Sequence, residues 1–332
     1  MIVVGAGIIG LSCAWRLAQR GHRVTIFDSR ETACEASWAG AGMLAPGGEL
    51  EEASPLTQMA LSSLAQYPGF VAELQDASGI SIDYQRCGAI EVALTLLEAD
   101  ALERRAARQS ALGIHSEIAT YSGSVSARFY PSDQLVAPRD VTAALQVACL
   151  RGGVEIRANE SVTQLRPDGS VTTNFGEYLS DGVLIAAGAW SSMLFPNLPL
   201  TMPVRGHLVS YDIDRTLLST IVRRGGTYLL QRSKGTVVAG SSTEYVGFDR
   251  TIDERVVNGI HERASQLLPN LASLSPSARW NGFRPGVTGD TPVIGRIEST
   301  SIWTAFGHYR NGILLAPETA RVIASMVTET LG

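Results

Sequence analysis

No stretch of the 332-residue chain holds about 18 uninterrupted apolar residues, so the sequence predicts no integral membrane segment. A secretory signal is not expected either, because Met1 runs directly into the strand-like Ile2–Val4 without a basic region or a cleavage site. The four cysteines are scattered and form no C-x-x-C pair, which speaks against disulfides and against a metal site. Together these absences favour a cytoplasmic protein with free thiols.

The chain also has no excess of positive charge. The 27 Lys and Arg residues are outnumbered by 32 Asp and Glu residues, and the net charge of −5 argues against a nucleic-acid partner, which needs a basic face. The composition is that of a packed globule, with 45% hydrophobic and 18% charged residues. The length predicts two domains, and the 33 glycines suit an α/β protein with tight turns next to a ligand.

The start of the chain predicts one β-α-β unit. Ile2–Val4 reads as a buried strand, residues 11–20 as a helix, and residues 23–28 as the next strand. The helix and the second strand are separated by Gly21-His22, which breaks the helix. Because such units are right-handed and parallel, the chain is expected to begin in a parallel sheet of the nucleotide-binding type.

A G-x-G-x-x-G motif, formed by Gly5, Gly7 and Gly10, joins the first strand to the helix. Gly5 permits the tight turn, Gly7 the approach of a diphosphate, and Gly10 the packing of helix on strand. The helix start offers N–H groups to phosphate, and Asp28 can accept hydrogen bonds from an adenosine ribose. A carboxylate at this position disfavours a 2′-phosphate, so NADP is not expected. A glycine-rich turn that binds nothing is the weaker alternative. The motif alone does not separate NAD from FAD.

The middle of the chain predicts a β-rich region inserted between the first and last parts. Residues 37–48 are rich in Gly and Ala and fit a loop along a cofactor or a plain surface loop. Asp140 is the expected cap of a helix over 141–150, and residues 154–165 suggest a small antiparallel meander. Other strands are expected at 87–95, 182–188, 207–211, 227–231, 235–239 and 301–306, and other helices at 54–67, 69–77, 97–112, 253–268 and 316–328.

Seven segments jointly point to one family. They are GAGIIGLS (5–12), SWAGAGML (37–44), AAGAW (186–190), PVRG (203–206), WNGFRPG (280–286), PVIG (292–295) and GHYRNGILLAP (307–317). With them the sequence resembles the D-amino-acid oxidase and glycine oxidase branch of FAD-dependent amine oxidoreductases, most closely the glycine oxidases of thiazole (thiamine) biosynthesis. The likeness spans nearly the whole chain.

The resemblance implies an α/β fold with an α+β insertion, in which an FAD-binding Rossmann-like domain carries a substrate domain with a mainly antiparallel β-sheet. We expect the discontinuous FAD-binding domain to comprise residues 1–80, 135–205 and 285–332, and the substrate-binding domain residues 81–134 and 206–284. No cysteine lies near Arg284, where sarcosine-oxidase relatives tether their flavin, so we expect non-covalent FAD.

The resemblance also implies which residues hold FAD. Ile8, Ile9, Asp28 and Ser29 would lie at its adenosine-diphosphate half, Val162 on the adenine side, and residues 41–43 along the flavin ring. The loop at 308–314 would cradle the flavin pyrimidine, where N–H groups of a helix start can stabilise the reduced ring. The full expected set is Gly5, Gly7, Ile8, Ile9, Gly10, Asp28, Ser29, Ala36, Ser37, Ala41, Gly42, Met43, Val162, Gly188, His308, Tyr309, Arg310, Asn311, Gly312, Ile313 and Leu314.

Three residues match the family's substrate-binding and catalytic positions. Arg284 matches the arginine that binds the amino-acid carboxylate, Tyr228 a tyrosine that reaches the same carboxylate, and Arg310 a second arginine near the site. For Arg310 an ion pair that fixes the loop is an equal alternative. Glu49 is expected near the pocket entrance, with an exposed glutamate as the alternative. Thr243 stands where the glycine oxidase pattern has methionine, beside the substrate side chain.

The expected reaction is oxidation of a small amino acid (glycine, sarcosine or a D-amino acid) by hydride transfer from Cα to flavin N5, with oxygen as acceptor and hydrogen peroxide as product. The alternatives are a dehydrogenase with another acceptor, an FAD-binding protein without turnover, and an NAD-dependent dehydrogenase. The sequence leaves open the preferred amino acid, the electron acceptor, and whether the chain forms a homo-oligomer.

Overall fold

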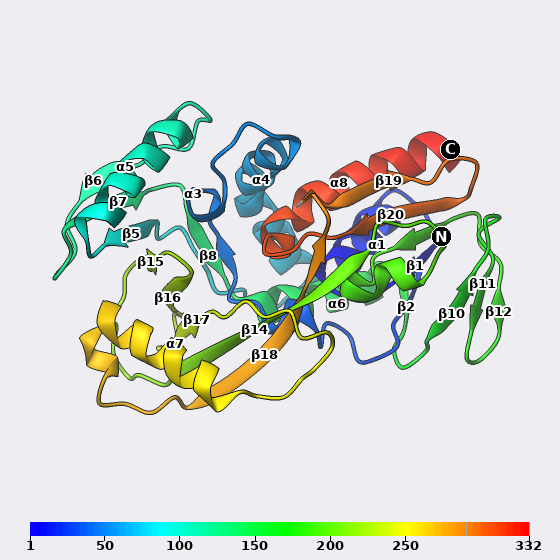
Figure 1. Cartoon of the computed structure of the whole chain (residues 1–332). Coiled ribbons are helices and arrows are strands. Elements are labelled where there is room, and N and C mark those ends of the chain that lie inside the picture. Colours follow the sequence, from blue (N-terminus) through cyan, green and yellow to red (C-terminus); the bar gives the residue numbers. More distant parts are fainter. Residues whose placement is uncertain (290, 332) are drawn as a thin grey trace.

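The computed structural model describes residues 1–289 and 291–331. A six-stranded sheet forms one half of the molecule, with strand order β19-β20-β13-β1-β2-β9 (Figure 1). Its strands are β1 (Ile2–Val4), β2 (Thr25–Phe27), β9 (Glu155–Arg157), β13 (Val183–Ile185), β19 (Val293–Arg296) and β20 (Ile302–Phe306). Neighbours are parallel except β19, which is antiparallel to β20. Helix α1 (Ile8–Gln19) connects β1 to β2, which confirms the predicted β-α-β unit.

Both faces of this sheet are buried. Val3, Ile26 and Leu184 face a core shared with helices α1, α4 (Pro55–Ser78), α6 (Pro138–Arg151) and α8 (Gly312–Leu331). Their neighbours Val4 and Phe27 face the other side, where a three-stranded antiparallel sheet of β10 (Val162–Leu165), β11 (Val171–Thr173) and β12 (Glu177–Tyr178) covers them. The strands are therefore apolar on both faces, as expected for a parallel sheet between two layers.

An eight-stranded sheet with order β18-β14-β17-β16-β15-β5-β7-β6 forms the other half (Figure 1). Its strands are β5 (Ala89–Ala93), β6 (Glu117–Ala119), β7 (Ser126–Tyr130), β14 (Thr201–Tyr211), β15 (Ile221–Arg224), β16 (Thr227–Gln231), β17 (Val237–Gly240) and β18 (Ala278–Val287). All pairs but β15–β5 are antiparallel. Helix α7 (Glu254–Leu267) packs on one face through Val257, Ile260 and Ala264. The mixed α/β fold class is thus confirmed.

Short elements complete the chain between these sheets. Strands β3 (Met43–Leu44), β8 (Gln134–Val136) and β4 (Tyr84–Gln85) form a small antiparallel sheet. The remaining helices are α2 (Ala36–Ala39), α3 (Pro46–Glu49), α5 (Leu96–Ser110) and the 3₁₀ segments η1 (Gly188–Met193) and η2 (Pro269–Leu271). Within residues 1–289 and 291–331, no helix has both the length and the apolar character needed to cross a bilayer.

Three expectations about local structure were wrong. The two helices expected at 54–67 and 69–77 are one helix, α4, which continues through Pro68 on its exposed side. Helix α6 begins at Pro138, whose fixed φ suits a first helical position, so Asp140 is in the first turn rather than at the cap. The strand near 154–157 joins the parallel sheet beside β2, which leaves only β10–β12 as the meander.

The longest strand pair was only partly predicted. Strands β14 and β18 pair over ten residues, and Pro203 stands opposite Pro285 in that register. The prolines and the adjacent glycines interrupt the alternating pattern that predicts strands, so β14 was expected to begin only at residue 207 and β18 was missed.

Candidate active site

A cavity of about 690 Å³ lies where the two large sheets meet. Residues of the first turn, such as Gly5 and Gly7, line it together with residues of the eight-stranded sheet, such as Tyr228 and Arg284. The loop between β20 and α8 closes it through residues 308–313. One continuous cavity therefore connects the nucleotide motif with the residues expected at the reacting end.

The glycine turn is shaped by close backbone packing. Gly5 has φ of +110°, and a Cβ there would lie 2.4 Å from the carbonyl oxygen of Ala186. A Cβ on Gly10 would lie 1.9 Å from the carbonyl oxygen of Gly5, so the first turn of α1 packs directly on the end of β1. The two positions thus require glycine for conformation and packing, as the motif predicts.

Asp28 lies at the end of β2, where its carboxylate is fixed by the backbone. Its Oδ2 accepts a hydrogen bond from the N–H of Ala6 (2.7 Å), and its Oδ1 accepts one from the N–H of Arg30 (2.9 Å). Burial raises the pKa of the carboxyl group, and these two hydrogen bonds oppose that shift. Asp28 lines the cavity, and each carboxylate oxygen retains acceptor capacity for a ribose hydroxyl.

The loop before α8 presents backbone to the cavity. Tyr309 has φ of +47°, and helix α8 begins at Gly312. The side chain of His308 is buried, and its Nε2 lies 3.0 Å from Thr319 Oγ1. Burial lowers the pKa of His308 to about 3, which favours the neutral imidazole near neutral pH. The free N–H groups of the helix start can hold an anionic ring edge.

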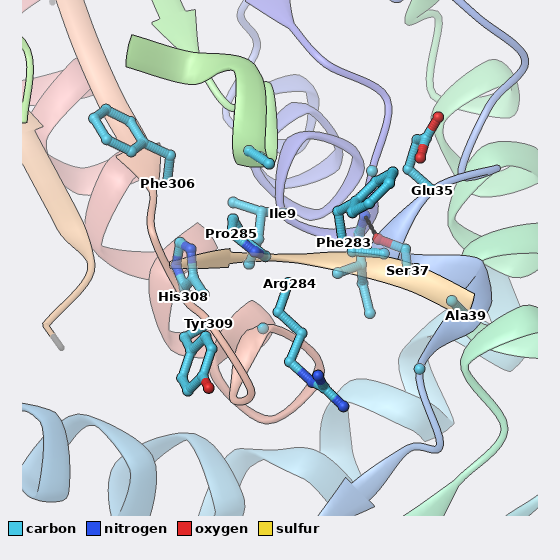
Figure 2. Close-up of a pocket in the computed structure, with 18 of the residues that line it drawn as sticks. Ile9, Glu35, Ser37, Ala39, Phe283, Arg284, Pro285, Phe306, His308 and Tyr309 are labelled. Atoms are coloured by element: carbon cyan, nitrogen blue, oxygen red, sulfur yellow. Dashed lines mark hydrogen bonds between the residues drawn. The ribbon is translucent and has the colours of Figure 1, made fainter. Parts of the chain in front are cut away.

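Arg284 and Tyr228 line the part of the cavity that is formed by the eight-stranded sheet. Arg284 is on β18, and its guanidinium donates from Nη2 to Ser241 Oγ (2.9 Å) and from Nη1 to the carbonyl oxygen of Ser242 (3.1 Å). Within the described residues no carboxylate lies within 4.0 Å of it. Figure 2 shows its side chain extending in the same direction as that of Tyr309. A partly buried guanidinium without an acidic partner is suited to bind a carboxylate from a ligand.

Tyr228 is held in place by a glycine on the neighbouring strand. A Cβ on Gly240 would lie 2.4 Å from the Tyr228 hydroxyl oxygen, so only glycine leaves room for the phenol. Burial raises the pKa of this hydroxyl, while Arg284 and Arg310 oppose the shift. The phenol remains protonated near neutral pH and can donate a hydrogen bond into the cavity.

Arg310 forms an ion pair with Glu49. Its Nε lies 2.9 Å from both carboxylate oxygens of Glu49, which is the last residue of α3. This contact corresponds to the structural alternative for Arg310, and it places both side chains in the cavity wall. Because Nε makes the pair, the outer nitrogens of Arg310 remain available as hydrogen-bond donors.

Most of the expected site residues are brought together, and three are not. Gly10 and Leu314 are buried behind the cavity wall, where Leu314 belongs to the helical core. Thr243 is exposed and lines a second cavity beside α5 instead. Trp38, in the SWAGAGML segment, lies against Arg139, whose guanidinium carbon is 3.7 Å from the ring centroid.

Several residues that line the cavity were not predicted from the sequence. They are Arg30, Glu35, Trp190, Met193, Arg223, Ser241, Phe248 and Arg250. Trp190 was part of a quoted motif without a role, and its ring stacks on that of Phe248 at a centroid distance of 4.7 Å. The others lie mostly in loops, which carry no periodic signal that could have identified them.

Proteins of similar sequence and structure identify the family of the chain. Residues 1–326 match the family model described as FAD dependent oxidoreductase. The chain is 32% identical to a glycine oxidase of Geobacillus kaustophilus, over 98% of this chain and 92% of that protein. It is also 32% identical to a glycine oxidase of Pseudomonas aeruginosa, over 99% and 94%. The crystal structure of glycine oxidase from Geobacillus kaustophilus superposes with a TM-score of 0.95 at 31% identity, over 99% of this chain and 94% of that one. The chain therefore belongs to the family of FAD dependent oxidoreductases.

Proposed function

We propose that this FAD-dependent enzyme is an oxidase of small amino acids, with glycine, sarcosine or a D-amino acid as substrate. The net reaction converts the amino acid, oxygen and water to the 2-oxo acid, the amine and hydrogen peroxide. Bound FAD supplies the acceptor for the hydride that leaves the carbon next to nitrogen. The glycine oxidases to which the chain is similar support this choice of substrate class.

The observation that carries the proposal is the state of Arg284. Its guanidinium is partly buried, has no acidic partner among the described residues, and is held by Ser241 and Ser242. Burying a charge without a partner is costly, so the site is complete only when an anion is bound. A planar carboxylate fits the guanidinium in a bidentate manner, and the Tyr228 hydroxyl in the same cavity can donate a further hydrogen bond.

The test is Arg284→Met. Breaking a buried carboxylate–guanidinium contact costs about 2–5 kcal/mol, so flavin reduction at low substrate should slow by roughly 30-fold to several thousand-fold with amino acids. Amines without a carboxylate should lose little, and FAD content should remain normal. Anaerobic stopped-flow bleaching of the flavin measures the rate. Equal effects on both classes of amine, or no effect, would contradict the amino-acid assignment.

Arg279→Met is the matched control. Arg279 lies on the same strand, is exposed, and pairs with Glu254 on α7 at 3.3 Å. Its loss removes the same charge from β18 without touching the cavity, so the rates with all amines should stay at the level of the parent enzyme.

A second candidate is a dehydrogenase that passes electrons to an acceptor other than oxygen. Oxygen reactivity depends on small differences in access to the flavin, so the products formed in air distinguish the two candidates. Release of one hydrogen peroxide per amino acid in air is the outcome that the oxidase proposal requires. Its absence, together with turnover in the presence of a quinone, would establish the second candidate.

We further propose that FAD is held without a covalent bond. All four cysteines are free thiols, and none of them lines the cavity. Acid precipitation should therefore leave the flavin in the supernatant. The free thiols also support the proposed cytoplasmic location. The division into an FAD-binding part (1–80, 135–205 and 285–332) and a substrate-binding part (81–134 and 206–284) remains our proposal for the domains.

A further inference from the structure

Two of the arginines in the cavity have no role in the function proposed above. The cavity is lined by Arg30, Arg223, Arg250, Arg284 and Arg310. Arg284 and Arg310 are at the reacting end, and the buried Arg223 is paired with Glu91 and Asp133. FAD carries two negative charges on its diphosphate. Among the described lining residues, Arg30 and Arg250 are the cations left to neutralise these two charges.

A single glutamate joins these two arginines. Glu35 Oε1 lies 3.1 Å from Arg30 Nη1 and 2.7 Å from Arg250 Nη2. The other oxygen, Oε2, is buried without a hydrogen-bond partner. The three side chains together carry a net charge of +1. An isolated carboxylate at this place would repel a diphosphate, whereas this cluster attracts one.

The segment that follows Glu35 contacts the start of α1. Glu35 immediately precedes α2, and the Oγ of Ser37 in that helix accepts the N–H of Ile8 at 2.9 Å. Figure 2 shows Glu35, Ser37 and Phe283 on the same side of the cavity. The first turn of α1 is where a dinucleotide places its diphosphate, so the cluster and the helix start face the same group.

The backbone around Arg250 is ordered by contacts with the eight-stranded sheet. Arg205 Nη1 donates to Asp249 Oδ2 (2.8 Å) and to the carbonyl oxygen of Thr251 (3.1 Å). Asn281 Nδ2 donates to the carbonyl oxygen of Arg250 (3.0 Å). The guanidinium carbon of Arg250 lies 5.0 Å from the Phe283 ring centroid. The side chain is thus positioned before any ligand binds, which lowers the entropic cost of binding.

We propose that Arg250, together with Arg30, binds the diphosphate of FAD, and that Glu35 positions the two guanidinium groups. The guanidinium fork suits phosphate oxygens, and Arg250 reaches them from the segment between β17 and α7. That segment belongs to the part of the chain that carries Tyr228 and Arg284. Binding of FAD therefore connects the part of the chain that carries Tyr228 and Arg284 to the nucleotide-binding part. The inference concerns only the cofactor and does not depend on which substrate is oxidised.

Arg250→Gln tests it through FAD affinity rather than through activity. Equilibrium dialysis of the holoenzyme should give a Kd for FAD raised about ten-fold or more, because a charge-assisted contact is lost. Arg250→Lys keeps the charge and should recover part of the affinity. Arg255→Gln is the control, since Arg255 is an exposed arginine only five positions along the chain, and its Kd should be unchanged.

Competition separates a phosphate contact from a purely structural role. ADP and adenosine are each used to displace FAD from the holoenzyme. The Ki of each competitor is calculated with the Kd of FAD in the same variant. For Arg250→Gln the Ki should rise for ADP and stay unchanged for adenosine, whereas for Asp28→Asn, at the ribose position, it should rise for both. If Arg250→Gln weakens the binding of ADP and of adenosine equally, or the binding of neither, then Arg250 only forms an ion pair with Glu35 and the proposal is wrong. Failure here would leave the Arg284 test unaffected.

Discussion

Gly206 on β14 lies diagonally across from Arg284 on the paired strand β18, directly opposite Gly282, and the Arg284 guanidinium occupies the space that a side chain on Gly206 would fill. A Cβ at Gly206 would lie 2.2 Å from Arg284 Nη1 and 2.3 Å from Nη2. The glycine of the PVRG motif therefore shapes the proposed substrate site by leaving room for the guanidinium. Its absent side chain sets the direction in which the proposed carboxylate-binding group points.

Gly206→Ala should displace that guanidinium. A shift of about 1 Å in a positioning group costs on the order of 100-fold, so kcat/KM for amino acids should fall by about that factor while FAD content stays normal. Gly176→Ala is the control, because a Cβ there meets nothing within 4 Å. Unchanged kinetics in Gly206→Ala would mean that Arg284 has a second position from which it binds substrate equally well.

The ion pair between Glu49 and Arg310 should contribute to stability. Both side chains are 22% exposed, and the pair joins α3 to the loop before α8. A double-mutant cycle with Glu49→Gln and Arg310→Met, measured by chemical denaturation at saturating FAD, should give a coupling energy of about 0.5–3 kcal/mol. The exposed pair Arg279–Glu254 should give close to zero in the same experiment. A coupling for Glu49–Arg310 as small as in that control would show that the contact is not maintained in solution.

The buried His308 should make the protein less stable in mild acid. Its pKa is lowered to about 3 in the folded state, below the ordinary value of 6.5, so between these values only the unfolded chain binds the proton. Stability from this group is therefore full above pH 6.5 and is lost as the pH falls toward 3, by about 1.4 kcal/mol per unit.

His308→Gln should remove that part of the pH dependence. The difference in unfolding free energy between the parent and the variant, measured by denaturant titration from pH 7 to 5, should shrink as the pH falls. His115→Gln, at an exposed position, should leave the slope unchanged. A parallel pair of curves for His308→Gln and the parent would show that folding does not lower the pKa of His308.

Local sequence was sufficient for the nucleotide end of this molecule. The demands on Gly5 and Gly10 arise within a turn of a few residues, where φ and backbone packing exclude other side chains, so the motif can be recognised without the fold. The family resemblance extended this to FAD and to Tyr228 and Arg284, which the structure places in one cavity. Their roles there remain predictions that the variants above examine.

Only the tertiary structure decided which distant side chains meet. Glu49 and Arg310 are 261 positions apart, and Glu35 and Arg250 are 215 positions apart. The segments that carry them have no periodic pattern, and their positions follow from contacts with other elements, such as those of Arg205 with residues 249 and 251. Thr243 is a further example. The family resemblance predicted that it lies beside the substrate, but in the structure it lines the second cavity. Helical and strand periodicity records which face of an element is buried, whereas a loop side chain is positioned by partners that its own sequence does not reveal.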